Sequence, residues 1–246
     1  MIDLAANRAA CGTNLDDLES HLTDVAARSH VPGSQVRQAL VLGWCREIGT
    51  ALERGPISET AETALTSYAH TFGFSGPELD TQGARQRLVK AAIIRDVIHG
   101  KVPSRVTIEG SLPFNLLKTE SLVWLFRDCA YSEDRVHTMR VGGYQGVSLR
   151  VMKGVYYHVG GFQSQSVQTH GIERIDVGML GVTNKNLYFA GKLRAMRIPY
   201  TKIVSFDAYS DAIGIHRDAS NARPQIFQTN DGWFTYNLVA NLAKQA

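Results

Sequence analysis

Apolar positions in the last third of the chain alternate with polar ones at the period of an extended strand. Between Leu187 and Phe227, short apolar runs are separated by polar turn residues. Pro199 stands between two of these runs, where a strand start or a sheet edge tolerates it. A period of two places successive side chains on opposite faces of a sheet, so the pattern predicts short antiparallel strands. It fits poorly with the strand–helix alternation of a parallel, cofactor-binding sheet.

The pattern changes to a helical period near the end of the chain. Asn230 or Asp231 can cap a helix there, because a short side-chain oxygen accepts hydrogen bonds from the free amides of the first turn. The apolar stripe of this helix must be buried, and it consists of Trp233, Phe234, Leu238, Val239 and Leu242. We expect Trp233 and Leu238 to dock the helix onto the mouth of a small barrel.

Two stretches in this region resemble a known family. Gly181 to Phe189 reads GVTNKNLYF, and Arg197 to Ser205 reads RIPYTKIVS. Together they resemble the pattern of GRAM domains and bacterial pleckstrin-homology-like domains. The resemblance covers the chain from about Leu112 and is best after Gly181. It implies a seven-stranded bent sheet or barrel with a C-terminal helix, and it says little about function. Within it, Thr183-Asn184-Lys185 is typical of a turn, since Thr and Asn side chains bond their own backbone.

The first hundred residues show the helical period instead. Apolar residues from Leu15 to Val25 predict one helix, and those between Ser34 and Leu52 predict a second. Ser58 can cap a third helix that ends before Gly73, and Ser75 with Glu78 matches a capping box. A last helix is expected from about Gln82 to His99, before Gly100 and Pro103. Short helices joined by tight turns predict a compact helical bundle.

Part of this region also resembles a second family. The run from Gly55 to Asp80, with its caps and its Leu65, Ala69 and Phe72 spacing, resembles the second half of TerB-like helical domains. Those domains are associated with metal or stress sensing through clustered carboxylates. Here the acidic residues near the N-terminus are scattered along one helix, so a metal role is not carried over.

The two patterns together predict an α+β chain of two domains. Residues 1–101 form the helical bundle, residues 102–111 form a linker with a short strand at Val106–Ile108, and residues 112–246 form the barrel domain. Leu122–Phe126 is expected to be the first barrel strand. Val147–Val159 and Ile172–Val182 are expected to be the next long ones.

The composition of the chain gives expectations about its cellular location and its charge. The apolar content of 44% is ordinary for a folded chain, and no apolar run approaches the length of a membrane span. The start of the chain lacks a secretory signal pattern, so we expect a cytoplasmic protein of bacterial type. The 3 cysteines are far apart and predict neither a disulfide framework nor a metal site. Residues 111–246 carry 15 Lys and Arg against 10 Asp and Glu, a surplus of 5 that suggests an acidic partner.

The sequence gives little evidence for a catalytic site. The chain has no nucleophile elbow, no phosphate-binding loop, no metalloprotease motif and no paired-cysteine motif, and we expect no cofactor, metal or catalytic residue. The glycine-rich run Gly142–Gly146 is interpreted as a hairpin loop or bulge. Histidines fall on different predicted strands or loops, at His137, His158, His170 and His216. The alternative function is a hydrolase-type enzyme that uses His and Asp residues in the interdomain cleft.

Basic side chains are the best candidates for a binding surface. One set, Lys192, Arg194 and Arg197, crowds a single predicted hairpin, and another, Arg140, Arg150 and Lys153, flanks the glycine-rich run. Their order does not reproduce the phosphoinositide-binding order of pleckstrin-homology domains, so an anionic lipid is possible but less favoured than a protein partner. No nucleic-acid reader motif accompanies them, so nucleic acid is not expected. The sequence therefore predicts a non-enzymatic interaction or scaffolding module that binds a protein.

Overall fold

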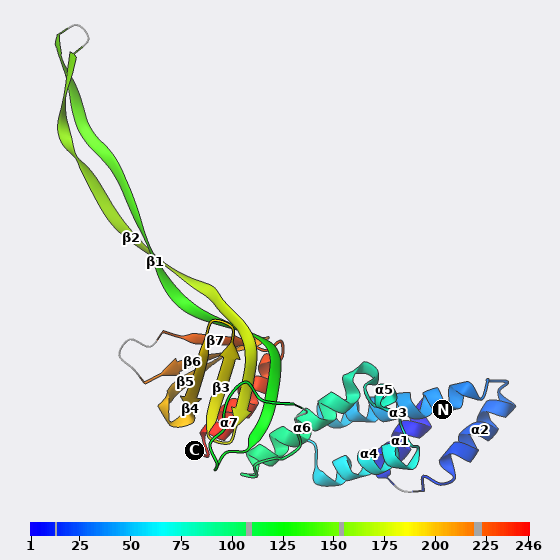
Figure 1. Cartoon of the computed structure of the whole chain (residues 1–246). Coiled ribbons are helices and arrows are strands. Elements are labelled where there is room, and N and C mark those ends of the chain that lie inside the picture. Colours follow the sequence, from blue (N-terminus) through cyan, green and yellow to red (C-terminus); the bar gives the residue numbers. More distant parts are fainter. Residues whose placement is uncertain (13, 107–109, 153–154, 219–222) are drawn as a thin grey trace.

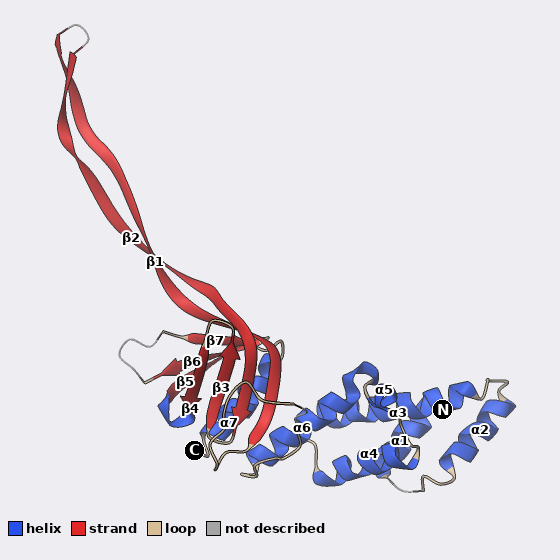
Figure 2. Ribbon diagram, viewed as in Figure 1, coloured by secondary structure: helices blue, strands red, loops and turns tan. Residues whose placement is uncertain are grey.

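The computed structural model describes the backbone of residues 1–12, 14–106, 110–152, 155–218 and 223–246, and the side chains of these ranges outside 134–170. Helices fill the first hundred residues, and strands with one closing helix fill the rest (Figure 2). The α+β prediction is therefore confirmed at this level.

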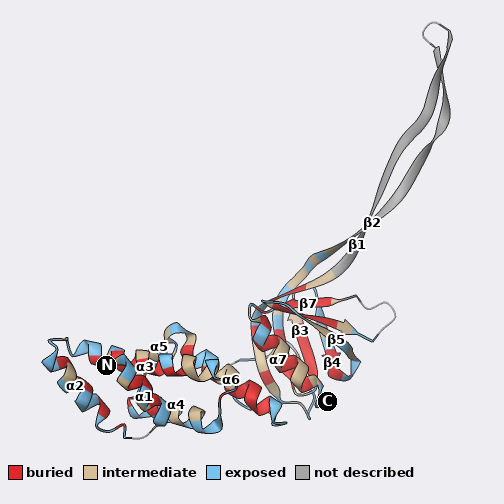
Figure 3. Cartoon of the chain, turned by 180° about the vertical axis from the view of Figure 1, so that it is seen from behind, coloured by how far each residue is buried: buried red, intermediate tan, exposed pale blue. Residues whose placement is uncertain are grey.

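The N-terminal part consists of α-helices and one short 3-10 turn. Their bounds are α1 Ile2–Cys11, α2 Leu18–Arg28, α3 Ser34–Glu53, α4 Glu59–Thr71, α5 Gly76–Leu79, η1 Thr81–Gly83 and α6 Ala84–Ile98. Their apolar faces enclose one core, in which Leu22, Leu40, Trp44, Ile48 and Tyr68 are almost completely buried. In Figure 3 the buried positions lie along the facing sides of these helices.

Several of the predicted helix ends are confirmed. The Ser58 hydroxyl accepts a hydrogen bond from the amide of Ala61 at 3.1 Å, as expected for an N-cap. The Ser75 amide donates to Glu78 at 2.7 Å in the expected capping box, and Gly73 takes a left-handed φ of 53° just after α4. The sequence analysis did not predict α1, because Ala5, Ala6 and Ala9 bury its face without large apolar side chains.

The C-terminal part is a 7-stranded antiparallel sheet in the order β4-β3-β2-β1-β7-β6-β5. The strands are β1 Leu122–Met152, β2 Val155–Thr183, β3 Asn186–Gly191, β4 Ala195–Pro199, β5 Ile203–Ala208, β6 Ala212–Arg217 and β7 Gln225–Gln228. A short turn, η2 Tyr200–Lys202, joins β4 to β5, and helix α7 Gly232–Ala243 closes the chain. Asp231 caps α7 as predicted, since its carboxylate accepts from the amide of Phe234 at 3.1 Å.

The sheet is open, so the prediction of a closed barrel is wrong. Strands β4 and β5 each pair with one neighbour, and no ladder joins them within the described residues. Helix α7 covers one face of the sheet instead (Figure 1). Its Phe234, Leu238 and Leu242 share a core with strand residues such as Leu180 and Ile213.

Strands β1 and β2 are far longer than expected. Their register runs from Leu122↔Thr183 to Met152↔Val155 with irregularities near both ends of β1, and beyond the other strands they form a two-stranded ribbon (Figure 1). The Gly142–Gly146 run is part of this ladder, opposite Gly160–Ser164, so its interpretation as a loop was wrong. The Val147–Val159 segment is likewise divided between the end of β1 and the start of β2, whereas Ile172–Val182 lies in β2 as predicted.

The segment between α6 and β1 contains no helix or strand in its described residues, 99–106 and 110–121. The predicted strand at Val106–Ile108 lies outside the described residues except for Val106. The end of the segment is fixed to the sheet: Phe114 stacks on Tyr188 at 5.1 Å, and Glu120 accepts a hydrogen bond from the Tyr188 hydroxyl at 2.6 Å.

The Thr183-Asn184-Lys185 motif is a turn, as the sequence predicted. The Thr183 hydroxyl accepts hydrogen bonds from the amides of Lys185 at 3.2 Å and Asn186 at 2.9 Å. The Asn184 side chain accepts from the amide of Ser121 at 3.0 Å, which ties the incoming segment to the same turn. The polar residues of the motif therefore shape the backbone between β2 and β3.

Candidate functional site

The candidate site lies where α6 joins the two parts of the molecule. On this helix, Ala84, Leu88 and Ala92 belong to the core of the helical part. On another face of the same helix, Ile93 and Val97 are fully buried in the core that the sheet shares with α7. Helix α6 therefore belongs to both cores, and hollows form on either side of it.

Lys90 fixes the contact between α6 and the C-terminal part. Its ammonium donates to Asp231 Oδ2 at 2.6 Å and lies 5.7 Å from the centre of the Trp124 ring and 5.1 Å from that of Phe234. A cation over two ring faces is attracted by their negative π surface. Since Asp231 also caps α7, one lysine links α6, β1 and the start of α7.

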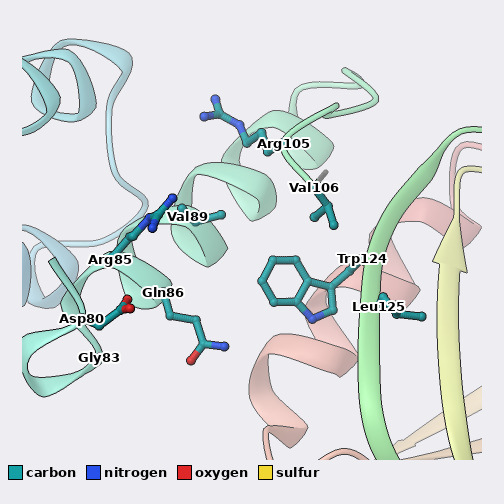
Figure 4. Close-up of a pocket in the computed structure, with 9 residues that line it drawn as sticks. All are labelled: Asp80, Gly83, Arg85, Gln86, Val89, Arg105, Val106, Trp124 and Leu125. Carbon is teal, nitrogen blue, oxygen red and sulfur yellow. The ribbon is translucent and has the colours of Figure 1, made fainter. Parts of the chain in front are cut away.

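The first hollow, which we call the polar cleft because charged and amide side chains make up part of its lining, measures about 740 Å³ and lies between α6, the segment after it and β1 (Figure 4). It is lined by Asp80, Gly83, Arg85, Gln86, Val89, Arg105, Val106, Trp124 and Leu125. Figure 4 shows Arg85 and Gln86 on the α6 side and the Trp124 indole opposite them. No histidine lines this cleft among the described residues, so the predicted His and Asp site does not assemble here.

The charge of Arg105 in this cleft is already neutralised. Its guanidinium donates to Asp96 at 2.8 Å and also pairs with Glu62. Burial alone would lower the pKa of Arg105, but its hydrogen bonds to the two carboxylates outweigh that effect and raise it. Buried Arg95 holds the same two carboxylates, 2.8 Å from Glu62 and 2.6 Å from Asp96. The four side chains form a structural ion-pair network that ties the segment after α6 to α4.

The second hollow, which we call the junction groove, is an apolar space of about 530 Å³ between the end of α3, α6 and α7. It is lined by Leu52, Gly55, Pro56, Arg87, Lys90, Ala91, Ile94, Ile98, Asp231, Trp233, Phe234 and Asn237. Trp233 is 65% exposed and Ile98 50% exposed, although both are large apolar side chains. The expectation that Trp233 docks α7 onto the sheet was therefore wrong, whereas Leu238 is fully buried as expected.

The position of Trp233 follows from helical geometry. Each residue turns the helix by about 100°, so Phe234, Leu238, Val239 and Leu242 share one face, and Trp233 falls nearly opposite its centre. The sequence contained this signal, but the stripe was treated as a single broad face. The other groove residues come from α3, the turn after it, α6 and the start of α7, so no local pattern could have grouped them.

The predicted basic residues lie in two different settings. Lys192 and Arg194 are exposed in the turn between β3 and β4. The Asp176 carboxylate shapes this turn by accepting from the amides of Leu193 at 2.7 Å and Arg194 at 2.8 Å. Arg197 is part of β4, where it is the register partner of Tyr188 and forms a hydrogen bond with its hydroxyl.

The second basic set lies on the long ribbon. Arg140 is the register partner of Ser166, and Arg150 that of Tyr156. Their side chains, and Lys153 altogether, lie outside the described residues. The same holds for the side chains of His137, His158 and His170.

The remaining predicted histidine, His216, lies on β6. Its Nε2 is 2.6 Å from Asp207 Oδ2 on the neighbouring strand β5, so the two form a partly exposed cross-strand pair. None of the cavities described above includes either residue. Among the residues that the structure describes, no group of His, Cys, Asp and Glu is arranged to hold a metal ion.

Comparisons with known proteins give no match: no family model, no curated protein and no solved structure resembles the chain significantly. No helix in the described ranges combines the length and apolar character that crossing a bilayer requires.

Proposed function

We propose that this chain is a non-enzymatic interaction module that binds a protein partner in the junction groove. The observation that carries the proposal is Trp233, which is 65% exposed at the edge of an apolar groove. Exposed indoles in apolar depressions are typical anchors of protein–protein contacts, because they bury a large area and lose little conformational freedom.

The groove is larger than one exposed side chain. It is lined by Ile98 from α6 and Trp233 from α7, together with the buried side chains of Ile94 and Phe234, which are 5% and 1% exposed. Two large exposed apolar side chains, one from each part of the molecule, therefore line the same groove, and exposed apolar patches commonly mark interaction sites.

The rim of the groove favours an acidic partner segment. Arg87 and Lys90 lie on neighbouring turns of α6 at its edge. Asp231 neutralises Lys90, whereas Arg87 has no ion pair within the described residues. An amphipathic helix or extended segment with apolar anchors and a carboxylate opposite Arg87 matches this arrangement.

The sheet supports the proposed GRAM or pleckstrin-homology-like fold. Consecutive strands are neighbours from β1 to β4 and from β5 to β7, β7 returns to pair with β1, and α7 follows the last strand. In this proposal the helical part is a bundle that contributes α6 to the binding site, and the protein acts in a bacterial cytoplasm.

The exposed turn with Lys192 and Arg194 is proposed as a second contact for the acidic partner. Asp176 holds its backbone by two hydrogen bonds, so the two cations are presented on an ordered turn. Arg197 stands apart from this pair through its bond to Tyr188, and we expect a smaller contribution from it.

The experiment is affinity capture of the tagged full chain from the organism that encodes it, with quantitative mass spectrometry of proteins and lipids. The Trp233→Ala variant should lose the captured protein. The matched control is Val204→Ala on β5, which removes an apolar side chain that is 68% exposed and outside the groove. The same partner recovered with Trp233→Ala as with Val204→Ala would refute the groove as the site.

A further inference from the structure

A third hollow opens between α4 and α6, within the helical part. It measures about 520 Å³, and most of its wall is apolar, with Trp44, Phe74, Leu79, Leu88 and Val89 among the lining residues. We call it the inner slot. Its volume is within the range of small-molecule sites, which are mostly apolar with a few polar groups.

The wall of the inner slot is held in place before any ligand arrives. Arg37 clamps the segment that carries Phe74: it pairs with both oxygens of Glu78, at 2.7 and 2.9 Å, and donates to the carbonyl of Gly73 at 2.9 Å. The Trp44 indole nitrogen already donates to the Leu65 carbonyl at 2.9 Å, so its polar atom needs no ligand. A preformed wall reduces the ordering cost of binding.

The mouth of the slot carries an arginine without an ion pair. Arg85 lines both the inner slot and the polar cleft, and it is exposed with no ion pair within the described residues (Figure 4). Glu62, which also lines the slot, is already paired with Arg95 and Arg105. Asp80 lies on the same side of the cleft as Arg85 (Figure 4), but no ion pair joins the two side chains in the described part of the chain.

We infer that the inner slot binds a small amphipathic anion, with its apolar body between α4 and α6 and its anionic group at Arg85. The face of α6 supports this arrangement, because Arg85, Leu88 and Val89 are spaced by three and four residues and share one side of the helix. The inference is independent of the junction groove, which uses the opposite side of α6.

Decanoate is a suitable probe, because it combines one carboxylate with an unbranched apolar tail. Isothermal titration calorimetry of the full chain should show saturable binding of decanoate and at least tenfold weaker binding of 1-decanol, which has the tail without the charge. Arg85→Ala should weaken decanoate binding about tenfold or more, since hydrogen bonds to charged groups are the stronger ones.

The chain offers a matched control on the same helix. Arg87 is two residues away, turned by about 200° around α6, and lines the junction groove instead. Arg87→Ala and Trp233→Ala should bind decanoate within twofold of the wild type. Both arginines are exposed, so neither change is expected to unfold the chain, which circular dichroism checks.

Three results would overturn the inference: no saturable decanoate binding, equal affinity of the Arg85→Ala and Arg87→Ala proteins, or equal binding of decanoate and 1-decanol. Loss of decanoate binding with Trp233→Ala would also overturn it, because the probe would then occupy the junction groove. A Trp233→Ala protein that loses the protein partner but binds decanoate as the wild type does would show that the two sites are separate.

Discussion

Removing α6 should destabilise the sheet domain strongly, even though this helix precedes the boundary that the sequence suggests. Ile93 and Val97 are fully buried in the C-terminal core, and Ile94 is 5% exposed. Burying one such side chain contributes about 1.5–3 kcal/mol, so the three contribute roughly 5–9 kcal/mol as an upper estimate. That is comparable with the whole stability of a typical domain, about 5–15 kcal/mol.

The assay compares two fragments, residues 84–246 and residues 112–246, by urea denaturation followed by circular dichroism. The longer fragment keeps α6 and should unfold cooperatively. The shorter one should be largely unfolded or several kcal/mol less stable. Polar contacts add to the loss, since Lys90 no longer pairs with Asp231 and the Val97 carbonyl no longer accepts from Gln245.

A nicked protein provides the control. Cleavage between about Lys101 and Asn115 should leave the two pieces associated, because α6 stays in its core after the backbone is cut. If residues 112–246 alone matched the stability of residues 84–246 within about 1 kcal/mol, the view that α6 belongs to both cores would be wrong.

Three smaller changes test other parts of the account. Leu238→Ala should cost about 2–5 kcal/mol in the free energy of unfolding, because Leu238 is fully buried, whereas Trp233→Ala should change it by less than about 1 kcal/mol; urea denaturation of both variants compares them. Hydrogen bonds from Arg37 hold the pKa of Glu78 at about 2, below its usual 4.5, so the stabilisation by Glu78 is present above pH 4.5 and is lost as the pH falls towards 2. The stability deficit of a Glu78→Gln variant should therefore shrink over that interval, and a deficit that does not depend on pH would contradict this. Thr183→Val should cost about 1–3 kcal/mol, because two backbone amides lose their acceptor, and an unchanged thermal midpoint would show that the turn does not need the hydroxyl.

Local features of the fold could be predicted from the sequence, because they depend on neighbouring residues. The caps at Ser58 and Asp231 and the capping box at Ser75 each need one short side chain near free amides, and all three are present. The change from helical to strand period likewise predicted helices in the first hundred residues and strands after Leu122, since each period reflects one repeating backbone geometry.

Features set by distant contacts could not be predicted. The glycine-rich run Gly142–Gly146 has the composition of a turn, yet its ladder with β2 continues through it. The double role of α6 was also missed, because its apolar residues look alike whether they contact α3 or α7. The prediction that Trp233 is buried was wrong because all the apolar residues of the stripe were assigned to one face of the helix. The angle of Trp233 around the helix axis already separates it from Leu238.

A photo-crosslinking amino acid placed at position 233 in the full chain would test the central claim most directly. The account predicts a specific protein crosslink from position 233 in the organism that encodes the chain, weakened by Arg87→Glu and absent when the same crosslinker replaces Val204. No crosslink from position 233, or the same products from both positions, would contradict the claim that the junction groove holds a protein partner.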